Sequence, residues 1–132
     1  MNFVGEKFDK NNPERFNLVW VISRLRNDLK KFNKDGFKFL VSKGYSGESI
    51  SIKIKQFPKS ILKIDEIPSR GNIPNQFFDD DLIFELEKIG NAYNYDNSDS
   101  MTDYFDRNYY LHLEFYNKEL YMVENKNISK IY

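Results

Sequence analysis

The chain has 132 residues, no cysteine and a formal net charge of zero. This length predicts a single domain spanning residues 1–132. The sequence contains no run of about 18 apolar residues and no basic start followed by an apolar stretch, which argues against a membrane span and a signal peptide. Because it also lacks disulfide chemistry, we expect a soluble cytoplasmic protein.

The charge is unevenly distributed along the chain. Residues 1–66 carry 14 Lys and Arg against 8 Asp and Glu, whereas residues 67–132 carry 6 against 12. Such an asymmetry can steer a charged partner to one face of a protein. The simpler interpretation is that the two halves attract each other within the fold.

The first predicted element is a helix that starts at Asn12-Pro13-Glu14 and ends at Asp35-Gly36. Asn is a good helix cap, Pro fits the first turn, and Gly suits the end of a helix. Apolar residues recur between them at steps of three and four, which indicates one buried face. These residues are Leu18, Ile22, Leu25, Leu29 and Phe32.

An antiparallel hairpin is predicted next. Apolar and polar residues alternate over residues 37–42 and 49–55, with Gly44-Tyr45-Ser46-Gly47 as the loop between two strands. In the expected register Val41 faces Ile50 and Phe39 faces Ile52. The opposite face then sets Lys38 beside Lys53, and these like charges call for an acidic neighbour or an anionic ligand.

Residues 57–78 contain three prolines and predict a long connection, with a short edge strand at residues 61–64. Asp79-Asp80-Asp81 then predicts the start of a second helix, because acids favour the positive end of the helix dipole. The buried face of that helix is expected to carry Leu82, Leu86, Ile89 and Tyr93.

A second hairpin is predicted from residues 109–116 and 119–124, joined by a turn at Asn117-Lys118. The order helix, hairpin, helix, hairpin predicts an α+β fold. We expect a four-stranded antiparallel sheet with the two helices packed on one face. The strand order is not readable from the sequence.

The segment between the second helix and the second hairpin, residues 93–106, holds four Asp and four aromatic residues. A loop of this make-up usually binds a partner or is clamped to the fold. Our candidate partner-binding residues are Tyr45, Tyr95, Asp96, Asp99, Asp103, Tyr104 and Asp106.

The same carboxylates raise the question of a cation site, but their spacing does not match a calcium loop. Met101 stands where the sharp turn needs Gly, and Arg107 stands where the bidentate Glu belongs. Hydrogen-bonded turns and caps explain Asp and Ser here without a metal, so we expect neither a metal nor a cofactor. The single histidine, His112, is expected on the outward face of a strand opposite Val123, where no catalytic partner is specified.

Two charge-based alternatives remain. A basic patch with Tyr45 would suit a nucleic-acid-binding surface, although a solvated basic face is the simpler interpretation. Its residues are Lys30, Lys34, Lys38, Lys43, Lys53 and Lys55. Alternatively, residues 79–81 and 96–106 together would imitate DNA phosphates and occupy a basic groove of a nucleic-acid enzyme, although helix caps and pairing with the basic half of the chain are the simpler interpretation.

Two stretches together resemble one of the large polyvalent protein-associated domain families, which are small α+β modules of phage and plasmid proteins. One runs from the basic end of the first helix through Phe37-Lys38-Phe39 to Tyr45-Ser46-Gly47-Glu48-Ser49-Ile50, and the other is residues 93–106 with its Asp-x-Met-x-Asp-Tyr ending. Together they cover about half of the chain. Glu48 departs from the pattern, where a second small residue is expected, and the Pro-rich middle has no counterpart.

The resemblance implies a phage or plasmid accessory protein in the cytoplasm of a bacterial host, and it supplies no catalytic residues. Small proteins of this origin often block host defences. The leading hypothesis is therefore a non-catalytic inhibitor of a defence nuclease, such as a CRISPR effector or its complex with nucleic acid. Direct binding of nucleic acid through the lysines is the alternative. An enzyme is the least favoured class, because no nucleophile, base and oxyanion site come together.

Overall fold

The computed structural model describes residues 3–44, 48–61, 72–73, 78–98, 101, 106–116, 121–124 and 127–130. The predicted α+β class is confirmed, while the predicted arrangement of the strands is wrong. The helical elements are α1 (Leu18–Asp28), the 3-10 helices η1 (Leu29–Asp35) and η2 (Lys59–Ile61), and α2 (Asp80–Gly90). The strands are β1 (Phe3–Val4), β2 (Lys38–Lys43), β3 (Ser49–Pro58), β4 (Asn72–Ile73), β5 (Tyr95–Asp96), β6 (Tyr110–Tyr116), β7 (Tyr121–Glu124) and β8 (Asn127–Lys130).

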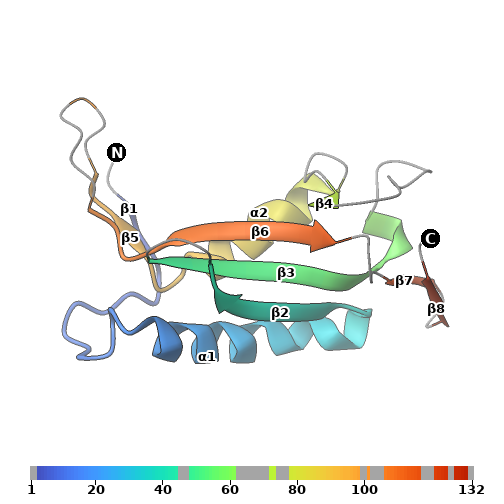
Figure 1. The fold of residues 1–132 in the computed structure, drawn as a ribbon, viewed down its shortest axis with the longest axis horizontal. Coiled ribbons are helices and arrows are strands. Elements are labelled where there is room, and N and C mark those ends of the chain that lie inside the picture. The colour runs from blue at the N-terminus through green and yellow to red at the C-terminus, as the bar shows by residue number, and fades with distance from the viewer. Residues whose placement is uncertain are drawn as a thin grey trace.

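Most strands belong to one mixed sheet organised around β3 (Figure 1). Its path is β4-β6-β3-β7-β8, and β2 pairs with the other edge of β3. β6 and β7 both run parallel to β3, and β2 runs antiparallel to it. The expected four-stranded antiparallel sheet built from two helix-hairpin units is therefore not what forms.

The second predicted hairpin fails because β6 and β7 do not turn back on each other. Phe115 of β6 lies beside Ile54, and Tyr121 of β7 lies beside Gln56, so the chain continues along one edge of β3. Lys38 of β2 also pairs with Gln56, which places β2 on the opposite edge. A parallel neighbour needs a crossover connection, and α2 lies within the one between β3 and β6.

The first hairpin is confirmed, but its register differs by two residues from the predicted one. Val41 pairs with Ile52 and Phe39 pairs with Ile54. A shift of two keeps every side chain on the same face of the sheet, so the hydrophobic pattern permits both registers. The shift also separates the two lysines expected to face each other, because Lys53 pairs with Leu40.

The first helix begins later than predicted. Asn17 caps α1 by accepting hydrogen bonds from the backbone N–H groups of Val19 and Trp20, at 3.1 and 3.4 Å. Asn12 instead forms a turn, accepting the N–H of Glu14. The helix tightens into η1 at Leu29 and ends at Gly36, whose φ of 93° is the left-handed conformation expected of a glycine there.

The start of the second helix is confirmed. Asp79 caps α2, its Oδ2 accepting the N–H of Leu82 at 3.0 Å. Of the strand predicted at residues 61–64, Ile61 belongs to η2 and the other three residues lie outside the described residues. Within the part of the chain that the structure describes, no helix has the length and apolar character needed to cross a membrane.

The helices contact the side of the sheet on which Ile52 and Ile54 point. The Phe32 ring of η1 meets that of Phe39, which pairs with Ile54. At the end of α2, Gly90 approaches Ile52 and Leu111 so closely that a Cβ there would lie 2.6 Å from a Leu111 methyl group. These contacts form part of the hydrophobic core.

Candidate functional site

A small second sheet, β1 with β5, lies at one end of the molecule (Figure 1) and carries the first part of the acidic aromatic segment. Here Tyr95 donates its hydroxyl to Asp106 Oδ1 at 2.6 Å, and Arg107 Nη2 lies 2.7 Å from Asp96 Oδ2. The hydroxyl of Ser98 accepts the N–H of Asp106 at 2.8 Å. We call these five residues the clasp, because they join the two ends of the loop.

Asp96 is held in its charged form by the clasp. Its Oδ1 accepts the N–H of Ser98 at 3.0 Å, which is the kind of Asp turn that the sequence predicted. The hydrogen bonds from Ser98, followed by the Arg107 charge, lower the pKa of Asp96 below its usual value. Asp96 therefore has a structural partner on each carboxylate oxygen.

Two buried amides fasten the clasp to the body of the protein. Asn94 Nδ2 donates to the carbonyl of Tyr109 at 2.9 Å, and its Oδ1 accepts the N–H groups of Tyr95 and Tyr109. Asn108 Nδ2 donates to the carbonyls of Arg15 and Tyr93 at 2.7 and 3.1 Å. These bonds tie the N-terminal segment, the turn after α2 and the start of β6 together.

Aromatic side chains surround the clasp. The rings of Phe8 and Phe16 lie 5.1 and 6.3 Å from that of Tyr95. Phe16 is 53% exposed, and Met101, between the two ends of the loop, is 92% exposed. The accessible groups around the clasp therefore include apolar anchors, whereas Asp96 and Asp106 are engaged within it.

The structure brings together only part of the predicted site. Tyr95, Asp96 and Asp106 meet in the clasp, as described above. Tyr45, Asp99, Asp103 and Tyr104 lie outside the described residues. The acids of residues 79–81 stand at the opposite end of α2, about 16 Å from the turn that leads to β5, so they and the clasp do not form one acidic surface.

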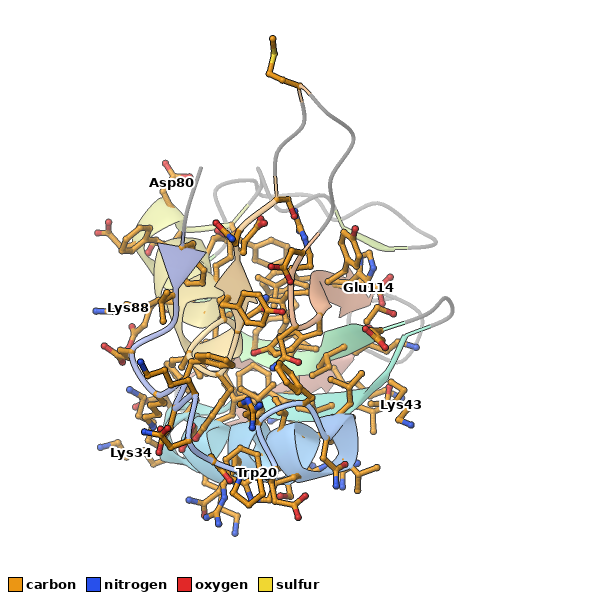
Figure 2. All side chains as sticks on the ribbon, turned by 90° about the vertical axis from the view of Figure 1, so that its left-hand side faces the viewer. Trp20, Lys34, Lys43, Asp80, Lys88 and Glu114 are labelled. Carbon is orange, nitrogen blue, oxygen red and sulfur yellow. The ribbon has the colours of Figure 1, made fainter. Side chains whose placement is uncertain are left out.

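The candidate lysines do not gather on one surface either. Figure 2 places Lys34 and Lys43 on opposite sides of the molecule. Lys30 lines a groove beside Phe39 and Val41, on the helix side of β2. Lys53 alternates with Ile52 and Ile54 along β3, so it points to the opposite face of the sheet, as does Lys55 two residues later. Lys38 lies exposed at the start of β2.

The groove beside β2 contains Asn33, which was not predicted from the sequence as a site residue. It has a volume of about 120 Å³, and Arg26, Lys30 and Asn33 supply its polar side chains. Arg26 Nη2 also donates to the carbonyl of Val41 at 2.9 Å. In a 3-10 helix residues three apart line up, so η1 aligns Asn33 with Lys30 and turns Lys34 away. The hydrophobic pattern contains no signal for this change of pitch.

Neither the histidine nor the acids form a metal site within the described ranges. His112 is exposed on β6 as predicted, but it pairs with Ser51 instead of Val123. No group of three His, Asp or Glu side chains in those ranges is close enough to hold a metal ion.

The fold and the clasp together define a small α+β protein in which the polar cluster of the clasp has a structural role. No family model, curated protein or solved structure matches the chain. The resemblance to a large polyvalent protein-associated domain therefore stays a prediction.

Proposed function

We propose that this protein is a non-catalytic binding protein that acts by covering a surface of its partner with the groups around the clasp. One observation carries the proposal: the clasp fixes both ends of the loop, while Met101 between them is 92% exposed. Met101 and Phe16 are both exposed, and apolar side chains of this type often anchor protein interfaces.

The proposed partner is a bacterial defence nuclease, such as a CRISPR effector, or its complex with nucleic acid. This choice rests on the resemblance to phage and plasmid modules and on the acidic character of the loop. Because the clasp engages Asp96 and Asp106, we assign any imitation of DNA phosphates to Asp99 and Asp103.

A structural role for the buried tyrosines supports a non-catalytic function. Burial, followed by the hydrogen bond to Asp28, raises the pKa of Tyr93, and burial raises that of Tyr109. Tyr93 donates its hydroxyl to Asp28 and Tyr109 donates to the carbonyl of Gly90. Both therefore stay protonated at neutral pH and serve as hydrogen-bond donors between elements.

The proposal is tested by capturing partners of the tagged protein from a bacterial lysate that expresses a CRISPR effector, with and without nuclease treatment. We expect one effector protein that survives the nuclease, and loss of its capture in Met101→Lys and in Asp99→Asn/Asp103→Asn. The matched control is Asp80→Asn/Asp81→Asn, which removes two acids at the far end of α2. Capture that is lost equally in the control, or kept in both loop variants, contradicts the proposal.

A second candidate, binding of nucleic acid, is supported by the groove between α1, η1 and β2. Arg26 and Lys30 are one helical turn apart, and the groove also offers the amide of Asn33 to a phosphate. We expect Arg26→Gln/Lys30→Gln to weaken binding of a labelled oligonucleotide and to lower the salt dependence of that binding. The control is Lys53→Gln, which removes a charge on the opposite face of the sheet. The absence of any binding by the parent protein at low salt removes this candidate.

A further inference from the structure

A cluster of exposed apolar side chains lies between β1 and α2. Val4 of β1 is 67% exposed and Phe84 of α2 is 70% exposed. Together with Phe3 they line a groove of about 300 Å³. Contiguous apolar patches of this kind on a small protein usually mark an interaction site.

In the part of the chain that the structure describes, the strand that borders this groove is paired along one edge only. Within the described residues β1 pairs with β5 alone. Gly5 directs its N–H toward β5, donating to the carbonyl of Asn94 at 2.7 Å. Because successive residues of a strand point their backbone groups to opposite edges, the N–H and C=O of Val4 point away from β5. An apolar groove beside such an edge is suited to accept an additional strand.

The rim of the groove carries charges of both signs. Glu6 and Glu87 contribute carboxylates, and Lys88 contributes an ammonium group. Figure 2 looks at this end of the molecule and shows Lys88 beside β1. A two-fold contact brings identical patches together, so a patch that contains both acid and base is complementary to itself. An antiparallel strand edge is self-complementary in the same way.

We propose that the protein forms a two-fold symmetric dimer in which β1 of one copy pairs antiparallel with β1 of a second copy. The two Phe84 side chains and the two Val4 side chains become buried, and Lys88 of each copy faces the carboxylates of the other. The contact is smaller than a standard interface, so the dimer is weak and depends on concentration. This inference does not rest on the proposed function, and a dimer would present two clasps.

The test is sedimentation velocity of the purified protein over a concentration series from about 10 to 500 µM. The weight-average mass is expected to rise from that of a monomer toward that of a dimer. Phe84→Asp places a charge in the groove, and Val4→Lys places one on the strand edge. Each is expected to raise the dissociation constant at least about tenfold. Circular dichroism confirms that each variant is folded.

The matched control is Val19→Asp, which changes an equally exposed apolar residue, 63% exposed, on α1. It is expected to dimerise like the parent protein. Exchanging the rim charges, Glu87→Lys/Lys88→Glu, preserves both signs and is expected to change the dissociation constant less than about threefold. A parent protein that stays monomeric throughout the series overturns the proposal. Dimerisation that survives Phe84→Asp, or is lost in Val19→Asp, overturns it as well.

Discussion

At the scale of single residues, polar side chains join the two ends of the loop to each other. Asp96 and Asp106 were selected from the sequence as partner-binding residues, yet each has an intramolecular partner in Arg107 or Tyr95. Two amide side chains, those of Asn94 and Asn108, connect the clasp to the rest of the protein, and both are nearly fully buried. A buried amide is compatible with a stable fold only if its hydrogen bonds are made, and those of Asn94 and Asn108 are made.

The first prediction concerns the titration of Asp96. Its hydrogen bonds from Ser98 and the charge of Arg107 lower its pKa, so the carboxylate stabilises the clasp above the unfolded pKa of about 3.9 and loses this effect as the pH falls through the folded pKa. NMR titration of the Asp96 carboxyl carbon should give a pKa below that of a model peptide. Arg107→Gln should raise it. A pKa at or above the model value contradicts the geometry of the clasp.

The second prediction is that Asn94→Ala destabilises the protein by about 3 kcal/mol, because it leaves the N–H and C=O of the buried Tyr109 without the side-chain bonds that satisfy them. Urea unfolding measures the change in the free energy of unfolding. The control is Asn27→Ala on the exposed side of α1, expected within about 0.5 kcal/mol of the parent. Equal effects for the two substitutions would show that the buried amide bonds contribute little.

At the scale of elements, close backbone approaches decide how the ends of the helices and strands dock. Gly5 follows β1 directly against the turn after α2, and a Cβ at this position would overlap the carbonyl oxygens of Asn91 and Ala92. The carbonyl of Ala92 also accepts the N–H of Lys7. No side chain can be added at Gly5 unless the N-terminal segment moves away from the body.

The third prediction follows from this contact. Gly5→Ala should detach β1 from β5 and lower stability by about 1–3 kcal/mol, the usual range for an overpacked site. Hydrogen exchange should then be faster at the amides of Gly5 and Lys7, which are protected in the parent by bonds to Asn94 and Ala92. The exposed neighbour substitution Glu6→Ala is the control and should leave both amides protected. Unchanged exchange in Gly5→Ala would refute the close approach.

At the scale of the whole molecule, three aromatic rings join distant parts of the chain. Phe57 of β3 and Phe115 of β6 both contact Phe78, which precedes α2. The rings of Phe78 and Phe115 are nearly parallel, with centroids 3.5 Å apart, and all three side chains are fully buried. This cluster packs the crossover between β3 and β6 against the two strands that it connects.

The fourth prediction is that Phe115→Ala lowers the free energy of unfolding by about 3–5 kcal/mol, because it opens a cavity where β3, β6 and the start of α2 meet. Thermal or urea unfolding measures it. Phe84→Ala is the matched control, since Phe84 is largely exposed, and it should change stability by less than about 1 kcal/mol at low protein concentration. A small loss for Phe115→Ala would contradict the parallel packing of these strands.

Local signals in the sequence determined the elements themselves. The acids at residues 79–81 and the apolar spacing after them predicted the start of α2, because caps and helical periodicity act within one or two turns. Tyr93 was expected on the buried face of this helix, but it lies in the turn after the helix ends at Gly90. Alternating apolar residues predicted β2, β3 and β6 for the same reason. The α+β class follows from these elements, and Asp96 in a hydrogen-bonded turn was also readable from the sequence.

Only the tertiary structure decided which strands are neighbours, because every backbone offers the same donors and acceptors to any strand. The hydrophobic pattern repeats every two residues, so it permits the observed register of Val41 with Ile52 as well as the predicted one with Ile50. Likewise, Phe115 lies beside Ile54 in a parallel pair instead of facing a hairpin partner. Burial of the apolar sheet face against α1 and α2 selects one strand arrangement among several that the hydrophobic pattern permits. The same selection decides which charged side chains meet in the clasp.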